Sequence, residues 1–114
     1  MISAVAFVVA AALGTLARAE AGRRWNRAEG FPVGTLVVNV TGSFLLGLLS
    51  GVAPPLMTVL GVGGLGAYTT FSSFARDTVA LIEIRRLALA GAYVAASCCA
   101  GIAAAALGIA VATR

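Results

Sequence analysis

The segment that decides the fold runs from residue 63 to residue 74 and reads GGLGAYTTFSSF. It lies inside a long apolar stretch, because no charged residue occurs between Glu29 and Arg76. Its glycines loosen a helix, and its five hydroxyl side chains bring polarity into a membrane-length segment. Irregular backbone at membrane depth is tolerated only where it is buried in protein or lines a wet cavity. The segment therefore indicates a functional site rather than a membrane anchor.

The composition places the whole chain in a membrane. The chain has 114 residues, of which 61% are hydrophobic and 11% charged, and its mean hydropathy is +1.02. A soluble domain of this size cannot bury so much apolar side chain, whereas each membrane span needs about 20 apolar residues. We predict an all-α membrane protein, with a single domain over residues 1–114 and four transmembrane helices. The expected spans are residues 2–22, 31–53, 56–84 and 87–113.

Charge and side-chain chemistry argue against several classes of function. The net charge of +4 comes from arginine alone, and most arginines lie near the ends of the spans, where they suit lipid headgroups better than nucleic acid. Histidine, the commonest metal ligand and general base, is absent, so we expect no enzyme. We expect the adjacent Cys98 and Cys99 to be small buried apolar residues without a redox or metal role. Residues 17–19 imitate a signal-peptide cleavage site, but no basic segment precedes the apolar run, so we expect the first span to remain a helix.

The second span carries one narrow polar stripe. Its members recur at every fourth position and so share a helix face: Thr35, Asn39, Ser43, Gly47 and Gly51. Gly47 and Gly51 form a small-residue pair that lets another helix approach closely. Asn39 differs, because a carboxamide near the middle of a span costs free energy unless it has a partner. We therefore expect Asn39 to face a pore or another polar group.

The third span is expected to consist of two half-helices, over residues 56–61 and 71–83, separated by a break over residues 63–70. Carbonyl groups that are freed at such a break are suited to binding a cation. Pro54 and Pro55 precede this span, and proline cannot continue a helix. The second and third spans should therefore be antiparallel neighbours.

Aromatic and charged residues follow the break. Phe71 and Phe74 are three residues apart and so point to the same side of the second half-helix. Arg76 and Asp77 follow one turn later, where we expect an aqueous vestibule. The fourth span, in contrast, looks structural, with a small-residue face formed by Ser97, Gly101, Ala105 and Gly108.

Arginine is unevenly distributed about the four spans. The loops after the first and third spans hold Arg18, Arg23, Arg24, Arg27, Arg85 and Arg86, whereas only Arg114 lies with the termini. The positive-inside rule then places these two loops in the cytoplasm and both termini outside.

The motifs described above, in their order along the chain, resemble those of the CrcB/Fluc family of fluoride channels. The resemblance rests on residues 34–39 (GTLVVN) and residues 69–74 (TTFSSF), with Arg18 near the end of the first span. It extends over the whole chain. It implies a multi-pass protein of the bacterial inner (plasma) membrane that confers fluoride resistance. It also implies an inverted, antiparallel dimer whose third helices break at mid-membrane, with two narrow pores through which cytoplasmic fluoride leaves passively.

The resemblance also implies roles for individual residues. The backbone carbonyls of Gly66 and Thr69 would bind a structural sodium ion at the centre of the dimer. Fluoride would pass along the ring edges of Phe71 and Phe74, which carry partial positive charge, and Asn39 would donate its amide to the ion. The remaining implied contacts are Thr35 and Ser72 along the pathway and Arg18 and Asp77 at the pore mouth.

The chain departs from the family pattern at three positions. Ala67 stands where a glycine usually follows Gly66, and Gly101 and Ala105 stand where the family usually places Ser and Thr along the pore. The missing hydroxyls and the uneven arginines favour one half of a heterodimeric pair over a self-paired, dual-topology subunit. The expected partners are therefore fluoride, the lipid bilayer and an inverted homologous subunit, without nucleic acid.

Two rival functions are weighed against this one. A small proton-coupled multidrug exporter also has four spans, but it needs a carboxylate in the first span, and residues 2–16 contain none. A non-conducting structural or assembly subunit of a fluoride channel agrees better with the fourth span, which has few polar side chains.

Overall fold

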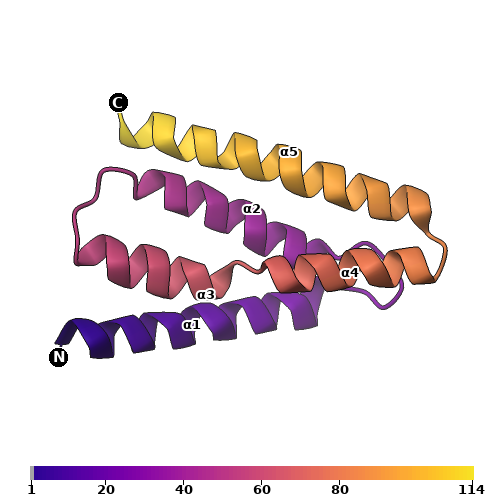
Figure 1. The fold of residues 1–114 in the computed structure, drawn as a ribbon, viewed down its shortest axis with the longest axis horizontal. Coiled ribbons are helices and arrows are strands. Elements are labelled where there is room, and N and C mark those ends of the chain that lie inside the picture. The colour runs from indigo at the N-terminus through magenta and orange to yellow at the C-terminus, as the bar shows by residue number, and fades with distance from the viewer. Residues whose placement is uncertain (1) are drawn as a thin grey trace.

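The chain folds into four helical passes that lie side by side (Figure 1). The structure, a computed structural model, describes residues 2–114. Its elements are α1 (Ile2–Trp25), α2 (Val33–Leu48), η1 (Met57–Leu65), α3 (Gly66–Tyr68), α4 (Phe71–Glu83) and α5 (Leu87–Ala112). Both termini lie at one end of the molecule, as an even number of passes requires. The longest dimension of 48 Å exceeds the roughly 30 Å of a bilayer's hydrocarbon core.

The outer surface is largely apolar, whereas the buried core is small. Large side chains point outward along the first and last helices, with Leu16 66% exposed and Ile102 73% exposed. Segments Ser3–Trp25 and Leu87–Ala112 are each long and apolar enough to cross a membrane. A surface of this kind requires lipid rather than water as its solvent. These features agree with the prediction of an all-helical membrane protein.

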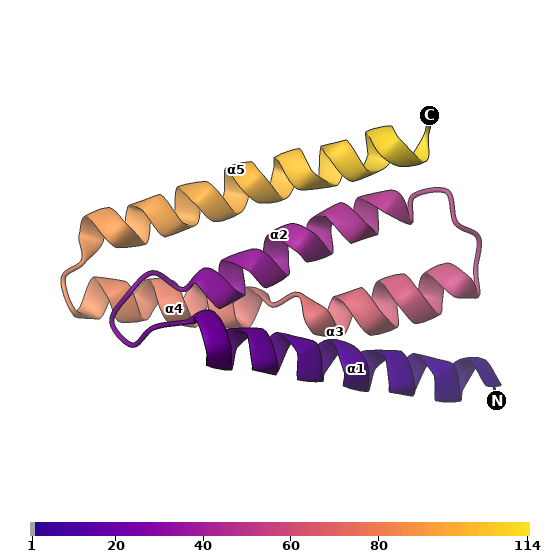
Figure 2. The same ribbon diagram turned by 180° about the vertical axis from the view of Figure 1, so that it is seen from behind.

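Glycines bring the helices into close contact in two pairs. Helix α5 packs on α2, where a Cβ added at Gly108 would stand 2.2 Å from the Phe44 carbonyl oxygen. Helix α1 packs on the third pass, where a Cβ added at Gly14 would stand 2.2 Å from the Gly64 carbonyl oxygen. Figures 1 and 2 show the resulting order, with α2 and the third pass between α5 and α1. As predicted, α2 and η1 run antiparallel.

The end of the second pass differs from the prediction. Helix α2 ends at Leu48, five residues before the expected boundary at residue 53. Gly47 contacts α5 as expected, since a Cβ there would stand 2.4 Å from the Ala105 carbonyl oxygen. Gly51 lies beyond the helix with a φ of +86° and nothing within 4 Å of an added Cβ. The expectation that Gly51 belongs to a helix-packing pair is therefore wrong, because its left-handed conformation serves the turn.

The third pass is broken, but over a much shorter segment than residues 63–70. Helix η1, which has wide π-type turns, continues directly into α3. Only Thr69 and Thr70 leave the helical conformation, with ψ angles of 157° and 118°. Gly63 is helical and packs closely, since an added Cβ would stand 3.0 Å from the ring of Phe7. The predicted extent of the break is wrong because Gly63 and Gly64 lie within the helix and pack against α1.

The expectation that Cys98 and Cys99 are buried is also wrong. Both thiols are exposed in the single chain. Helix α5 turns its small-residue face towards α2, at Ala105 and Gly108, and neighbouring positions on a helix point about 100° apart. The two cysteines therefore lie outside the packed face.

Candidate functional site

The break in the third pass is held by Asn39 of α2. Its Nδ2 donates a hydrogen bond of 3.0 Å to the Thr70 carbonyl, and its Oδ1 accepts a bond of 2.8 Å from the Thr70 N–H. In a continuous helix this N–H would bond to the carbonyl of Gly66. Asn39 therefore replaces the missing helical bond, and its carboxamide has the polar partner that the sequence required.

The two half-helices are stabilised separately at their ends. The hydroxyl of Thr70 caps α4 by accepting a bond of 3.0 Å from the Ser73 N–H. On the other side of the break, the Nε of Arg18 donates a bond of 3.2 Å to the Ala67 carbonyl. A cation beside the last carbonyls of a helix offsets their partial negative charge. Arg18 thus lies at the break itself.

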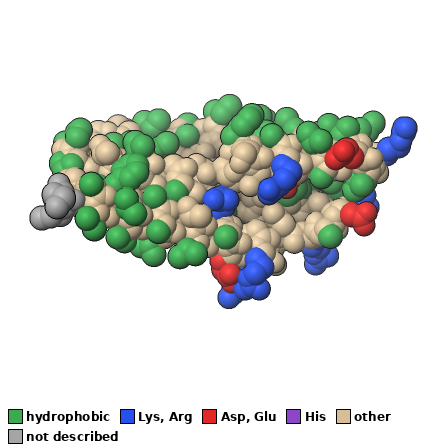
Figure 3. Space-filling model, turned by 60° about the horizontal axis from the view of Figure 1, so that its bottom comes forward, with side chains coloured by type: hydrophobic (Ala, Val, Ile, Leu, Met, Phe, Trp, Pro, Cys, Tyr) green, Lys and Arg blue, Asp and Glu red, His purple; other side chains and the backbone are tan. Residues whose placement is uncertain are grey.

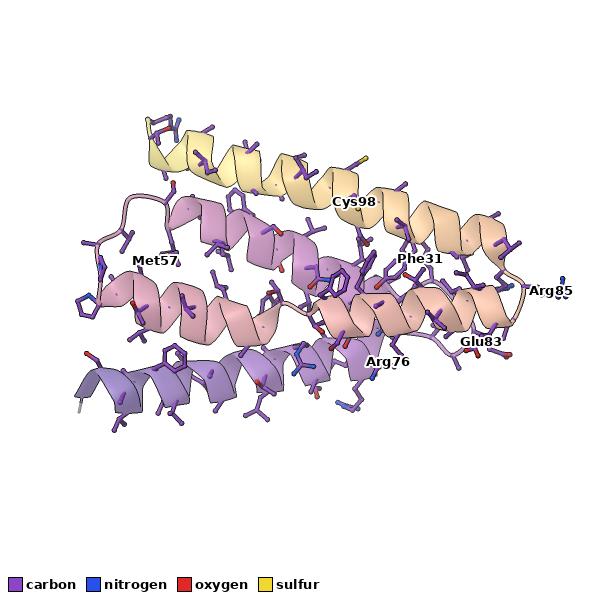
Figure 4. All side chains as sticks on the ribbon, viewed as in Figure 1. Phe31, Met57, Arg76, Glu83, Arg85 and Cys98 are labelled. Atoms are coloured by element: carbon purple, nitrogen blue, oxygen red, sulfur yellow. The ribbon has the colours of Figure 1, made fainter. Side chains whose placement is uncertain are left out.

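Aromatic rings form a row that begins beside the break. Phe71 is 79% exposed, and its ring centroid lies 5.9 Å from that of Phe74. Phe74 in turn packs on the buried Tyr93 at 5.3 Å, and Tyr93 packs on Phe31 at 5.5 Å. Figure 4 shows Phe31 on the side of the break towards α4. The predicted common side of Phe71 and Phe74 is confirmed by this contact.

A cavity of about 640 Å³ lies between α2, the third pass and α5. Asn39, Thr70, Phe71 and Phe74 all line it. The other lining residues are Gly42, Ser43, Leu46, Met57, Gly61, Val62, Leu65, Gly66, Thr69, Ser97 and Cys98. Within this lining, residues 2–114 contribute no carboxylate and no arginine. The cavity is therefore an open, largely apolar hollow with a few neutral donors.

Ser97 is a cavity residue that the sequence did not single out for function. Its Oγ is buried and has no hydrogen-bond partner among the described residues. A buried hydroxyl without a partner costs free energy, so Ser97 is suited to donate a hydrogen bond to a small ion or water in the cavity. The available signal was that Ser97 follows Tyr93 by four residues, which places two hydroxyls on one face of an otherwise apolar helix.

A second, smaller hollow of about 310 Å³ lies on the other side of the break. Arg18 and Ser72 line it together with Thr15, Gly66, Ala67, Thr69, Thr70 and Phe71. Ser72 is exposed, and its hydroxyl lies 3.3 Å from that of Thr70. Arg18, Ser72 and Phe71 are thus brought together, with Phe71 forming part of the wall of both hollows.

The carbonyls of Gly66 and Thr69 belong to this broken segment. Gly66 is exposed and lacks its usual helical donor, because the Thr70 N–H is bonded to Asn39. Thr69 is turned back on the helix, with its N–H and hydroxyl bonded to the Leu65 carbonyl at 2.9 and 3.0 Å. Neutral carbonyl oxygens are suitable ligands for an alkali cation. The backbone of this segment therefore has carbonyl oxygens of the type that bind alkali cations.

Thr35 and Asp77 lie in a separate polar network. Thr35 is 5% exposed, and its hydroxyl accepts a bond of 3.0 Å from Asn26 Nδ2 and donates one of 2.9 Å to Asp77 Oδ2. The Tyr93 hydroxyl also donates to this oxygen at 3.4 Å. Neither Thr35 nor Asp77 lines the cavity that contains Asn39. Asn26 was not identified from the sequence, because it lies in a polar loop where an amide carries no specific signal.

Gly101 and Ala105 lie on the side of α5 that faces α2. A Cβ added at Gly101 would stand 3.8 Å from the Ser43 Oγ, and the backbone of Ala105 approaches Gly47. Neither residue lines the large cavity, whereas Ser97 and Cys98 do. The two positions at which α5 departs from the family pattern therefore lie at the contact between α2 and α5.

Comparisons with a family model and with individual known proteins point to the same family. A family model described as CrcB-like protein, Camphor Resistance (CrcB), matches residues 5–109. Fluoride-specific ion channel FluC 2 of Rhodococcus jostii (strain RHA1) is 46% identical, over 85% of this chain and 87% of its own length. Fluoride-specific ion channel FluC of Novosphingobium aromaticivorans is 38% identical, over 96% of each chain. Fluoride-specific ion channel FluC 1 of Nitrobacter hamburgensis is 42% identical, over 82% of this chain and 81% of its own length.

A small all-helical membrane protein with a broken third pass is the class that the fold and site define. The chain belongs to the CrcB family. This confirms the resemblance that the sequence motifs indicated. The relatives are named as ion channels rather than enzymes, which agrees with the expectation that the chain is not an enzyme.

Proposed function

We propose that this chain is a subunit of a fluoride-selective channel that lets cytoplasmic fluoride leave a bacterial cell passively. The observation that carries the proposal is the position of Asn39, which braces the broken helix beside Phe71 and Phe74 in one cavity. The names of the relatives support the same ion. The lining described above offers no carboxylate to couple transport to protons, which supports a channel over an exporter.

The chemistry of the cavity suits a small, strongly hydrated anion. Such an ion must exchange its water for other donors and positive dipole ends. One hydrogen of the Asn39 Nδ2 is bonded to Thr70, and the second is available to an ion. The edges of Phe71 and Phe74 carry partial positive charge, and the Ser97 hydroxyl has no other described partner. These neutral groups would stabilise fluoride without binding it too tightly to leave.

A second, inverted subunit would complete the structure. Polar groups lie exposed near the middle of the helices, including the hydrogen-bonded hydroxyls of Thr41 and Tyr68 at 2.9 Å and the side chain of Ser72. Exposed polar groups at this depth are costly in lipid, so a protein partner or water must cover them. We propose that an inverted homologous subunit does so, with each third helix broken at mid-membrane.

A sodium ion would then be held at the centre of the dimer. Gly66 and Thr69 would contribute one pair of carbonyl oxygens, and the inverted partner would contribute an equivalent pair. The bound ion would fix the two broken helices relative to one another, which is a structural role.

We further propose that the partner is a different chain. Arginines remain concentrated at the end of the molecule opposite the termini, even though Arg18 lies at the break. That end holds Arg23, Arg24, Arg27, Arg85 and Arg86, whereas the end with the termini holds only Arg114. This bias would fix one orientation, with the loops after α1 and α4 in the cytoplasm. Gly101 and Ala105 lack the expected hydroxyls, but they face α2 rather than the cavity. They therefore do not decide between a conducting subunit and the alternative that this chain is a non-conducting structural subunit.

Fluoride efflux from liposomes tests these proposals. The purified chain would be reconstituted alone and together with a homologous subunit, and release would be followed with a fluoride electrode. We expect strong efflux only from the pair, and robust efflux from the chain alone would contradict the heterodimer. Efflux from the pair that is unchanged by Phe71→Ile in this chain would favour the structural subunit. Absence of fluoride release from every combination would contradict the channel.

A further inference from the structure

A basic pocket lies far from the break, at the end of the molecule opposite the termini. It has a volume of about 390 Å³ and is lined by Arg27, Ala28, Glu29, Gly30, Ile84 and Arg86. The Nη1 of Arg86 donates a bond of 2.7 Å to the Glu29 carbonyl, which joins the loop after α1 to the turn after α4. The pocket is thus built from two segments that are fixed to one another.

The two arginines of this pocket are available for an external anion. The ion pairs between described side chains join Glu20 to Arg23 and Arg24, which leaves Arg27 and Arg86 outside them. Both side chains are exposed, and Arg86 uses only one of its five N–H groups in the bond to Glu29. The carboxylate of Glu29 also lines the pocket, so an anion must bind on the arginine side.

The position of the pocket identifies the kind of anion. In Figure 3 the charged side chains lie between the middle of the visible face and one end of the molecule, whereas the other half shows green apolar side chains with tan surface between them. Figure 4 shows Glu83 and Arg85 at this same end. Trp25 closes α1 nearby with half of its surface exposed, as is common for tryptophan at a membrane interface. The pocket would therefore lie at the level of the lipid headgroups.

We propose that Arg27 and Arg86 bind the phosphate of an anionic phospholipid. Guanidinium groups bind phosphate through paired hydrogen bonds, and two of them converge on this pocket from different segments. Ile84 supplies an apolar wall for the glycerol and upper acyl chains. Bound lipid would hold the turn after α4 against the loop after α1.

The test measures lipid binding rather than transport, so its result is independent of the proposed channel activity. The purified protein in neutral detergent would receive phosphatidylglycerol, phosphatidylcholine or inorganic phosphate, and bound lipid would be counted by native mass spectrometry. We expect retention of phosphatidylglycerol and a higher unfolding temperature with this lipid alone. Arg27→Gln should weaken binding about fivefold, the effect of one basic residue near an anionic surface. Arg27 is chosen because its side chain makes no described hydrogen bond.

Arg114→Gln is the matched control, because it removes the same charge at the opposite end of the molecule. It should leave lipid binding unchanged, and Arg27→Lys should restore part of the affinity by keeping the charge. Equal loss with Arg27→Gln and Arg114→Gln would overturn the site, because attraction would then reflect net charge. Equal binding of inorganic phosphate or phosphatidylcholine would overturn the proposed lipid specificity.

Discussion

Asn39 and the backbone of Thr70 exchange two hydrogen bonds, of 3.0 and 2.8 Å, across the only non-helical step within the third pass. One side chain thereby bonds both the N–H and the carbonyl of the residue at the break. The same carboxamide lines the cavity that contains Phe71 and Phe74. Structural support for the break and contact with a permeating ion would therefore depend on a single residue.

Replacement of Asn39 by alanine is expected to affect stability and transport together. The Thr70 N–H and carbonyl would lose their partners, which costs about 1–3 kcal/mol for each buried group left unpaired. We expect a lower unfolding temperature in detergent and loss of fluoride efflux. Asn39→Asp keeps an acceptor for the Thr70 N–H but removes the donor to its carbonyl, so it should also be inactive. Wild-type efflux from either variant would contradict the role of the amide.

Substitutions of Phe71 and Phe74 should separate effects on fluoride transport from effects on stability. Phe71 is 79% exposed in the single chain, so Phe71→Ile should change the free energy of unfolding by no more than about 0.5 kcal/mol while reducing fluoride efflux. Phe74 packs on Tyr93, so Phe74→Ile should lower both. Chemical denaturation and liposome efflux of the same preparations provide the comparison. Equal destabilisation by the two substitutions would argue against this division of roles.

The adjacent cysteines give a test of access to the cavity. Cys98 lines it, whereas Cys99 does not, although both are exposed in the single chain. We expect a small, charged thiol reagent to block fluoride efflux through Cys98. Cys98→Ser should abolish the block, and Cys99→Ser should preserve it. Protection by Cys99→Ser instead would place the pathway on a different face of α5.

Two glycines of α5 should respond to alanine in opposite directions. A Cβ at Gly108 would meet the Phe44 carbonyl oxygen at 2.2 Å, so Gly108→Ala should force α2 and α5 apart and destabilise the fold by about 1–3 kcal/mol. A Cβ at Gly91 would have nothing within 4 Å, so Gly91→Ala should stabilise the helix by up to about 1 kcal/mol. Thermal unfolding of both variants in the same detergent would show the difference. A similar shift for both would contradict the packing of α5 on α2.

The sequence identified polar side chains that require a hydrogen-bond partner, but it did not identify the partner. Asn39 was singled out because a lone carboxamide in an apolar span is costly. Its partner is a backbone, which no residue type reveals. Thr35 shares the stripe of Asn39, yet its hydroxyl is occupied by Asn26 and Asp77 because the start of α2 meets two other segments there.

Glycine was the main source of error, because one residue type serves several purposes. Gly63 indicated a break, but it is helical and packs against Phe7. Gly51 indicated packing, but it adopts a left-handed turn. Four-residue spacing alone does not separate these cases, since the neighbouring helix determines which one applies. Tyr93 was also not identified from the sequence. Its buried contacts are with Phe74 and Asp77, which belong to a different helix, α4.

The two halves of the third pass are secured by different neighbours. The first half packs on α1, through Gly14 and the bond from Arg18, whereas the second half packs on α5, through the contact of Phe74 with Tyr93. Because α5 follows α4 along the chain, the Phe74 ring cannot reach its packed position until α5 has inserted beside α4. Before that step, the chain would already hold Asn39 and the first half-helix, but the row of aromatic rings would still be incomplete.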